Sequence, residues 1–205
     1  EEIRQQLDRH RGRVAIVWEK SVDAFIRQGD KALDTIFTVD ISAAMPRSQR
    51  MLLSLPIERA RQTREQMRAA RPKDAHSWDQ AVAHARLINP DTPQATGDDL
   101  AVILHTGGTN GVPKSVPLTH RNIGTNVNQC RMWVWKLHEG AETFYSLLPY
   151  FHAYGLTFFM CAAVHLAATQ LLLPKFDVDL ALEAHKRRPV TFFVGVPPMF
   201  ERVMN

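Results

Sequence analysis

The sequence predicts an α/β fold in which helices cover a largely parallel β-sheet. Short apolar segments alternate with helical patterns along the chain, as in proteins built from successive strand and helix units. These segments are continuous apolar runs, which is typical of strands buried on both faces of a parallel sheet. A chain of 205 residues is long enough to bury a full hydrophobic core.

The first part of the chain predicts two strands among helices. It opens with a helical pattern in EEIRQQLDRH, and RVAIVWE (13–19) predicts the first strand. KSVDAFIRQ then predicts a helix, and DTIFTVDI (34–41) predicts the second strand. Polar helices are expected from there through residue 85. One of them begins at SWDQ (77–80), which matches a capping box formed by Ser77 and Gln80.

A turn-rich linker, NPDTPQATG (89–97), divides the chain. We expect residues 1–97 to form an upstream α/β part with a helical insertion and the linker, and residues 98–205 to form a second α/β part. The chain opens inside one helical pattern and closes one turn into another, at PPMFERVMN, which is unusual for a complete domain. We therefore expect both parts to belong to one truncated domain.

The second part predicts two extended segments and a long helix. DLAVILHT (99–106) is a strongly apolar strand, and KSVPLT (114–119) is also extended. Thr119 is suited to cap the helix that follows. The spacing of the apolar residues on that helix predicts one buried stripe, which comprises Ile123, Val127, Cys130, Val134 and Leu137.

Strand and helix patterns continue to alternate toward the C-terminus. We expect strands at 143–149, 169–174 and 190–196, and helices at 152–167, 178–188 and from 197 onward. The apolar stretch 153–173 approaches the length of a membrane span, but it contains His165 and Gln170. We interpret it as a buried helix followed by a buried strand.

Composition excludes several classes of function. Hydrophobic residues make up 45% and charged residues 22%, and the net charge is only +4, as in ordinary globular proteins. The basic run 58–73 contains acidic residues at helical spacing and predicts a solvated helix rather than a nucleic-acid site. Cys130 and Cys161 predict buried free thiols in a reducing compartment. The tryptophans of MWVWK (132–136) flank the helical stripe and predict packing.

The segment HTGGTNGVPKSV (105–116) allows two interpretations. Asn110–Gly111 between extended segments is a strong signal for a β-hairpin. Additional glycines, two threonines and a lysine instead favour a loop whose backbone N–H groups bind phosphate. The spacing matches neither a Walker loop, since Pro113 precedes Lys114 and a strand follows, nor a Rossmann fingerprint. The residues alone leave both interpretations open.

Three segments in order resemble the adenylate-forming (AMP-binding) superfamily. TGGTNGVPKSV followed by PLTHRN resembles its phosphate loop, [ST]-[SG]-G-T-T-G-x-P-K-G-V. LLPYFHAYGL (147–156) resembles its P-[LM]-[FY]-H-x-x-G segment, and FFVGVPPMF (192–200) resembles the strand and loop that line its carboxylate pocket. The loop and its THRN ending look most like those of bacterial long-chain fatty-acid–CoA ligases. The resemblance implies an internal fragment of the large N-terminal domain of an acyl-CoA synthetase-like fold.

The resemblance also implies site residues. The pyrophosphate part of ATP would be held by Thr106, Gly107, Gly108, Thr109, Asn110, Gly111 and Lys114. His152, as the catalytic residue, would lie near the carboxylate, although the residues alone equally allow a structural histidine. The acyl pocket would include Tyr154, Gly155, Gly195 and Val196. No metal-ligand motif is found for a protein-held metal.

The implied reaction uses ATP with Mg²⁺, a fatty acid or related carboxylate, and coenzyme A. The acid attacks ATP to form an acyl-adenylate, and the thiol of coenzyme A then displaces AMP. The family's adenine, ribose and catalytic-lysine motifs do not occur in this chain, so we expect the fragment alone to be inactive. We expect no nucleic-acid partner and a cytoplasmic location, with peripheral contact at the inner membrane face left open.

Two departures from the family pattern keep alternatives open. Asn110 replaces a second threonine and Ser115 replaces a glycine. These substitutions are compatible with a noncatalytic nucleotide-binding domain of the same fold. Another adenylate-forming enzyme, specific for aryl, short-chain or amino acids, also remains an alternative, because the residues that select the acid lie mainly downstream.

Overall fold

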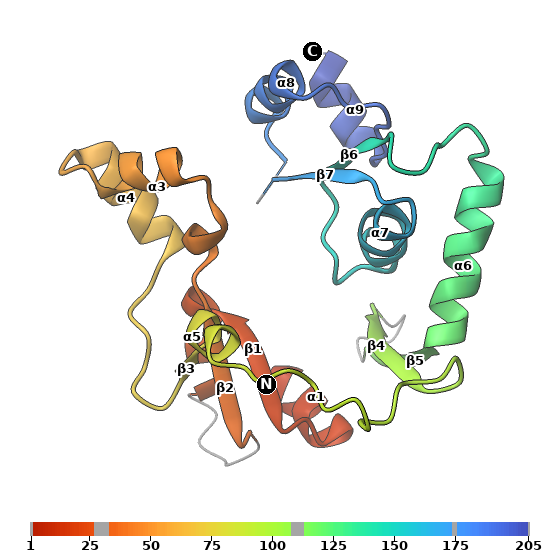
Figure 1. Ribbon diagram of the computed structural model, residues 1–205. Coiled ribbons are helices and arrows are strands. Elements are labelled where there is room, and N and C mark those ends of the chain that lie inside the picture. Colours follow the sequence, from red (N-terminus) through yellow and green to blue (C-terminus); the bar gives the residue numbers. More distant parts are fainter. Residues whose placement is uncertain (1, 27–32, 108–112, 174–175, 205) are drawn as a thin grey trace. The chain divides into compact units, whose positions relative to one another are not determined.

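The computed structural model describes residues 2–26, 33–107, 113–173 and 176–204. The chain forms two compact units, residues 1–92 and 93–205, which are considered separately (Figure 1). The boundary falls inside the segment 89–97 that the sequence predicts to be a linker. That segment contains no regular helix or strand.

The N-terminal unit contains a small parallel sheet and several short helices. In chain order its elements are α1 (Glu2–His10), β1 (Val14–Trp18), η1 (Glu19–Ser21), α2 (Asp23–Ile26), β2 (Thr35–Val39), η2 (Ile41–Ala44), α3 (Arg47–Ser54), α4 (Glu58–Met67), β3 (His76–Ser77) and α5 (Trp78–Ala83). Both strands and the polar helices that the sequence predicts for this half are therefore confirmed. Strand β3 was not expected.

The sheet order is β1–β2–β3, and all three strands are parallel. Ala15 and Val17 on β1 are buried in a small core, together with Val22 and Ala75. Between them Val14 and Ile16 remain 57% and 54% exposed, because alternate residues of a strand point to opposite faces. Among the described residues of this unit, β1 is thus covered on one face, whereas its continuous apolar sequence predicts two covered faces.

The start of α5 agrees in part with the predicted capping box. The Ser77 side chain accepts a hydrogen bond from the backbone N–H of Gln80 at 3.4 Å. The same residue also ends β3, whose register places His76 opposite Phe37 and Ser77 opposite Thr38. Ser77 therefore ends the strand and begins the helix, and the two-residue length of β3 explains why no periodic sequence signal reveals it.

The C-terminal unit contains the segments that resemble the adenylate-forming superfamily. Its elements are β4 (Leu100–Thr106), β5 (Lys114–Thr119), α6 (His120–Trp133), β6 (Thr143–Ser146), the π-helix η3 (Gly155–Ala162), α7 (Ala163–His165), β7 (Thr169–Leu172), α8 (Val178–Arg187) and α9 (Pro197–Met204). Strands β4 and β5 are antiparallel, and β6 and β7 are parallel.

One predicted strand, 190–196, is wrong in its extent. The backbone forms only an isolated parallel bridge between Phe192 and Phe144 of β6. The N–H groups of Thr191 and Phe192 both bond to the carbonyl of Thr143, at 3.0 and 3.3 Å. Residues 193–196 are not assigned to a strand, and α9 begins at Pro197.

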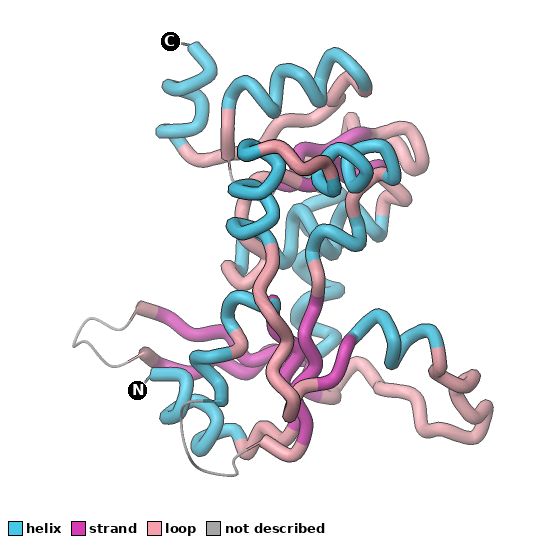
Figure 2. Tube along the Cα trace, turned by 90° about the vertical axis from the view of Figure 1, so that its left-hand side faces the viewer, coloured by secondary structure: helices cyan, strands magenta, loops and turns pink. Residues whose placement is uncertain are grey.

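The core of this unit is formed by side chains of β6, η3 and α7, with Leu166 after α7. In Figure 1, α7 lies beside β6 and β7, and Figure 2 shows the helices (cyan) and strands (magenta) of the chain from a second side. Phe144, Phe159 and Leu166 are its largest fully buried side chains. The ring of Phe158 stacks on those of Phe144 and Phe192, with centroids 6.0 and 5.6 Å apart. The predicted buried helix followed by a strand is confirmed, with π-helical geometry over most of its length. Within the described ranges, no helix is long and apolar enough to cross a membrane.

Helix α6 agrees with its predicted cap and only partly with its predicted stripe. Thr119 and Asn122 form a reciprocal capping box at its start. The later stripe residues Cys130, Val134 and Leu137 pack against the core around Phe144. Neither cysteine is in a disulfide, but both are only partly buried rather than buried.

The prediction that the tryptophans of MWVWK are packed is wrong. Trp133 and Trp135 are 86% and 74% exposed. Val134 between them packs against the core. Helix α6 ends at Trp133, so Trp135 lies in the turn that follows rather than on the predicted helix.

Candidate phosphate loop and apolar groove

Strands β4 and β5 place two of the predicted site residues opposite each other. Their antiparallel register pairs Thr106 with Lys114, His105 with Ser115 and Leu104 with Val116. Thr106 and Lys114 therefore form the last pair before the loop 107–113. Both are exposed, so their hydroxyl and ammonium groups are accessible to a ligand at this end of the hairpin.

The hairpin interpretation and the phosphate-loop interpretation are compatible in this geometry. The flanking strands pair as a hairpin requires, yet the connection is longer than the two-residue turn that Asn110–Gly111 would form alone. Gly107 is exposed, and a Cβ built on it would meet no atom within 4 Å. The predicted residues Gly108, Thr109, Asn110 and Gly111 lie outside the described residues.

An ion pair fixes the start of β4 to the start of α6. Arg121 donates from Nε and Nη2 to the two carboxylate oxygens of Asp98, at 2.8 and 3.1 Å. This guanidinium lowers the pKa of Asp98, and the carboxylate raises the pKa of Arg121. The backbone N–H of Arg121 also bonds to the carbonyl of Gly97 at 2.7 Å. Arg121 therefore positions the base of the hairpin, a role that its place in the THRN segment did not by itself reveal.

Hydrogen bonds of Asp99 also hold the end of the hairpin where β4 begins and β5 leads into α6. Thr96 donates to Asp99 Oδ2 from its backbone N–H at 2.6 Å and from its hydroxyl at 2.9 Å. These two bonds lower the pKa of Asp99. The carbonyl of Asp99 accepts a bond from the N–H of His120 at 3.1 Å. The first residues of β4 and α6 are thus joined by hydrogen bonds on both sides of the hairpin.

His152 lies in the turn that leads into the π-helix. Its N–H donates to the carbonyl of Pro149 at 3.1 Å, and its own carbonyl accepts from Leu156 at 2.8 Å. Its imidazole is exposed and lies against the ring of Phe151, with centroids 4.6 Å apart. The backbone of His152 is therefore fixed while its ring remains accessible.

Gly155 permits a close approach between this helix and the preceding loop. A Cβ at this position would lie 2.0 Å from the carbonyl oxygen of Pro149 and 3.0 Å from that of Leu148. Both neighbours are backbone atoms, so a side chain here would force the chain to shift. This explains why glycine occupies the last position of the H-x-x-G pattern.

Tyr154 and the segment 195–196 have partly exposed apolar surfaces. The Tyr154 ring packs edge-on against Phe158 at 6.0 Å and is 46% exposed, and partial burial raises the pKa of its hydroxyl. Gly195 lies against Met199 of α9, where a Cβ would be 3.2 Å from Sδ. Val196 is 39% exposed.

The predicted site residues thus occupy three places in the C-terminal unit. Thr106, Gly107 and Lys114 are at the open end of the hairpin, and His152 to Gly155 begin the π-helix. Gly195 and Val196 precede α9, after a segment held on β6 by the ring contact of Phe193 with Tyr145 at 5.7 Å.

An apolar groove of about 700 Å³ lies between β4, α6, η3 and α7. Ligand sites are commonly apolar clefts of about 300–1,000 Å³ with a few polar groups. The groove fits this description, since His120, Asn128 and His165 are the polar members of its lining. The apolar members include Val102, Ile123, Val127, Leu156, Met160, Cys161 and Val164.

Sequence reasoning missed this groove. Ile123 and Val127 belong to the stripe that predicts a buried helix face, and in the structure they line the groove. The helical spacing identifies the apolar face of α6 but does not show whether protein atoms or an open space lie opposite it. The groove borders the base of the hairpin at Ala101 and Val102, and it borders the start of the π-helix at Leu156, next to Gly155.

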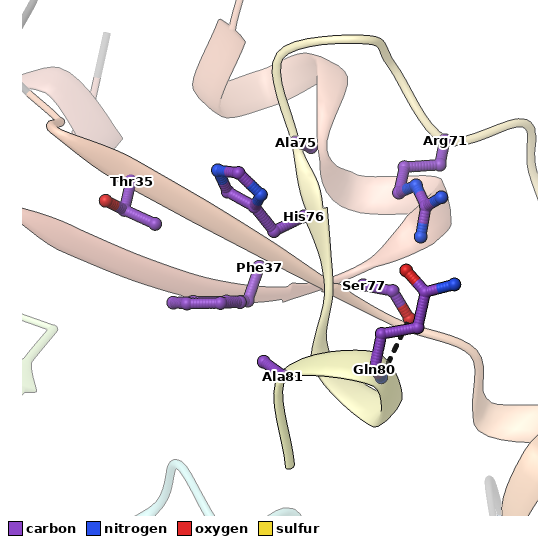
Figure 3. A pocket seen from close by; sticks show the side chains of 8 residues that line it. All are labelled: Thr35, Phe37, Arg71, Ala75, His76, Ser77, Gln80 and Ala81. Carbon is purple, nitrogen blue, oxygen red and sulfur yellow. Dashed lines mark hydrogen bonds between the residues drawn. The ribbon is translucent and has the colours of Figure 1, made fainter. Parts of the chain in front are cut away.

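A second pocket, of about 400 Å³, lies in the N-terminal unit beside β2, β3 and α5. In Figure 3, Phe37 and His76 lie on one side of the β3 backbone, whereas Arg71 and Gln80 lie on the other. Alternation along the strand places His76 and Ser77 on opposite faces. Arg71, Ser77 and Gln80 therefore lie on one side of β3 and His76 on the other, and the pocket contains no residue of the predicted site.

The sequence predicts no metal site built from protein side chains, and this prediction does not concern a metal ion that a nucleotide carries. Among the described residues, no three His, Cys, Asp or Glu side chains are grouped as metal ligands. Mg²⁺ is commonly bound by one or two carboxylates together with substrate phosphates. A magnesium ion that arrives with a nucleotide therefore does not need such a group.

Comparison with known proteins decides the family. The sequence model of the AMP-binding enzyme family matches residues 1–205, the whole chain. The chain belongs to the AMP-binding enzyme family. The resemblance inferred from its three motifs is thereby confirmed.

Curated members of the AMP-binding family with related sequences include ligases for different acids. A long-chain-fatty-acid–CoA ligase of Bacillus subtilis is 42% identical over 102 residues, covering 50% of this chain and 18% of that protein. One from Salmonella typhimurium is 32% identical over 135 residues, covering 64% and 24%. The 4-coumarate–CoA ligase-like protein 9 of Oryza sativa is 32% identical over 130 residues, covering 61% and 23%. The matched part is therefore a quarter or less of each relative.

Solved structures confirm the fold class. ATP-bound MatB from Rhodopseudomonas palustris has a TM-score of 0.58 at 23% identity and covers 95% of this chain and 41% of its own. MenE from Bacillus subtilis in complex with AMP has a TM-score of 0.57 at 18% identity, covering 94% and 51%. The N-terminal domain of FACL13 from Mycobacterium tuberculosis has a TM-score of 0.56 at 20% identity, covering 95% and 52%. The chain has the fold of an N-terminal region of these enzymes.

Proposed function

We propose that the protein carrying this chain is an ATP-dependent ligase that joins a long-chain fatty acid to coenzyme A. The observation that carries the proposal is the hairpin β4–β5, whose register pairs Thr106 with Lys114 at the mouth of a glycine-rich loop. The 42% identity to the Bacillus subtilis long-chain-fatty-acid–CoA ligase favours this acid class. The activity is assigned to the whole protein, of which this chain supplies part of the site.

In the first step a carboxylate oxygen attacks the α-phosphorus of ATP, and the bond to pyrophosphate breaks. Negative charge then develops on the leaving pyrophosphate, and fixed donors and cations stabilise it. Lys114 would supply a positive charge, and Thr106 a hydroxyl donor. The loop residues 107–111 would supply backbone N–H groups, and Mg²⁺ would be held mainly by the phosphates of the nucleotide.

In the second step the coenzyme A sulfur attacks the carbonyl carbon of the acyl-adenylate, and AMP leaves. In the first step His152 would orient the carboxylate, since its exposed ring stands on a hydrogen-bonded turn. Tyr154, Gly155, Gly195 and Val196 would border the pocket for the acid. These roles rest on the match of each position to the family motif.

The groove beside α6 would take the apolar chain of the acid. Its volume of about 700 Å³ and its predominantly apolar lining suit an alkyl chain rather than a charged or strongly polar acid. Leu156 belongs to this lining and lies in the same helical turn as His152, as their hydrogen bond shows. A chain held there would therefore begin beside the carboxylate site.

The experiment is ATP–pyrophosphate exchange by the whole protein with palmitate, octanoate, 4-coumarate, benzoate and a mixture of amino acids. Exchange with palmitate well above that with the other acids supports the proposal. Exchange only with coumarate or benzoate would favour the aryl-acid relatives, which the 32% identity to the coumarate–CoA ligase-like protein makes the second candidate. Absence of exchange from a folded protein would favour a noncatalytic binding domain.

The two cysteines provide a separate test of the groove. Cys161 lines it, whereas Cys130 packs against the core around Phe144. Palmitate should therefore slow alkylation of Cys161 by iodoacetamide and leave the rate at Cys130 unchanged. Equal rates at Cys161 with and without a saturating acid would show that the chain binds elsewhere, even if adenylation is observed.

A further inference from the structure

Two strongly exposed tryptophans lie at and just after the C-terminal end of α6. Met132, Trp133 and Trp135 are 79%, 86% and 74% exposed, and they fall within four consecutive residues. Apolar side chains scattered singly on a surface are common, but adjacent large ones mark interaction sites. The catalytic assignment does not use these residues, and they do not line the apolar groove.

The local structure holds these side chains at the surface. Val134 and Leu137 pack against the core around Phe144, so the backbone on either side of Trp135 is anchored. The N–H of Val134 bonds to the carbonyl of Cys130 at 3.0 Å, and that of Leu137 bonds to Val134 at 3.1 Å. The indoles cannot turn inward without removing Val134 from the core.

A buried carboxylate fixes the following turn. Glu142 is 8% exposed and accepts a bond from the N–H of His138 at 2.7 Å. It also accepts a bond from the hydroxyl of Thr191. The segment 132–137 is therefore held at both ends, and it presents its aromatic residues without a cost for ordering a flexible loop.

Basic side chains flank the aromatic residues. Arg131 precedes them, and the ammonium of Lys136 lies 5.3 Å from the centre of the Trp135 ring. Glu139 is the acidic residue that follows, and the imidazoles of His138 and His165 are nearby, the latter 3.4 Å from Arg131. Arg131 and Lys136 outweigh Glu139, so the segment has a net positive charge.

We propose that residues 131–136 form a peripheral docking surface for a bilayer that contains anionic phospholipids. Tryptophan is favoured at the boundary between headgroups and acyl chains, because its ring is apolar and its N–H is polar. Lysine and arginine beside it are attracted to anionic headgroups. The exposed indoles match the interfacial region of a bilayer, and the flanking cations complement the charge of its anionic headgroups. The inference does not depend on the proposed ligase activity.

The test measures binding of the whole protein to vesicles. The wild type is expected to sediment with vesicles of equal phosphatidylglycerol and phosphatidylcholine, and to bind pure phosphatidylcholine more weakly. The double substitution Trp133→Ser/Trp135→Ser should lower the partition coefficient at least tenfold. Lys136→Gln should lower it about fivefold, the equivalent of one basic residue near an anionic surface.

A spectroscopic readout and a matched control separate lipid contact from loss of structure. Lipids brominated on their acyl chains should quench wild-type tryptophan fluorescence, and the double variant, which keeps Trp18 and Trp78, should show little quenching. The control Leu87→Ser/Ile88→Ser removes two side chains that are 98% and 81% exposed, and it should bind vesicles as the wild type does.

Three outcomes would overturn the proposal. Wild-type protein that does not bind anionic vesicles would contradict it directly. Equal losses in the control and in the double variant would show that any exposed apolar pair is sufficient. A wild type that dimerises through this surface, and becomes monomeric in the double variant without a change in vesicle binding, would assign the surface to a second copy of the protein.

Discussion

Gly155→Ala should destabilise the protein, although alanine normally favours a helix over glycine. The added Cβ would lie 2.0 Å from the Pro149 carbonyl oxygen, and contacts below 3.0 Å are essentially never observed. The helix start or the 148–149 backbone must therefore move by about 1 Å, because neither obstacle is a flexible side chain. His152 is in the same turn, so the movement would also displace its ring.

The magnitude follows from two opposing effects. Replacing glycine by alanine inside a helix gains up to about 1 kcal/mol. Overpacking costs about 1–3 kcal/mol, and a clash with backbone lies at the upper end of that range. We therefore expect the free energy of unfolding to fall by about 2 kcal/mol, with a lower midpoint in urea and an unchanged slope.

Gly124→Ala is the matched control, since Gly124 is inside α6 and a Cβ there would meet no atom within 4 Å. This substitution should raise the free energy of unfolding by about 0.5–1 kcal/mol. Urea unfolding of both variants, followed by circular dichroism, compares the same chemical change in two environments. Equal or greater stability of Gly155→Ala would refute the close approach at Pro149.

Other perturbations test the supports of the site. Thr119→Ala should lower the free energy of unfolding by about 1 kcal/mol because it removes the cap of α6, whereas Thr119→Ser should restore most of it. Glu142→Ala should lower the free energy of unfolding by about 2–4 kcal/mol, since it removes the acceptor of the His138 N–H and one acceptor of the Thr191 hydroxyl, while Glu139→Ala should have little effect. Burial raises the pKa of both cysteine thiols, so iodoacetamide should alkylate them more slowly in the folded protein than in urea at the same pH. The raised pKa values also make the free energy of unfolding depend on pH. The stabilisation by the two neutral thiols is fully present below about pH 8.5, the pKa of a thiol in the unfolded chain, and it is lost as pH rises through the higher pKa of the folded protein.

Most elements could be predicted because their signals are local. The apolar runs at 14–18 and 35–39 and the cap at Thr119 each determine the structure of their own segment. Strand β3 and the shortened 190–196 segment could not be predicted in this way. Both depend on which distant backbone groups supply hydrogen bonds, and a two-residue strand has no period to detect.

The candidate site also has residues that the sequence predicts and features that depend on tertiary contacts. The loop glycines, Lys114, His152 and Gly155 are recognisable from spacing and motif, and the structure supplies the reason that Gly155 must lack a side chain. The groove and the exposed tryptophans were not predicted. A helical stripe at Ile123, Val127 and Val134 has one period, yet its first part borders an open groove and its last part borders the core. Only the tertiary arrangement separates these cases.

The central claim is that the β4–β5 hairpin binds the phosphates of ATP during adenylation. The most direct measurement is palmitate-dependent ATP–pyrophosphate exchange by the whole protein with Lys114→Ala, beside the surface control Lys136→Ala. The account predicts a decrease in the exchange rate of about 10²–10³-fold for Lys114→Ala, the usual effect of removing one group that stabilises developing charge. It predicts an unchanged rate for Lys136→Ala. Unchanged exchange in a folded Lys114→Ala protein would contradict the claim and leave the segment a structural hairpin.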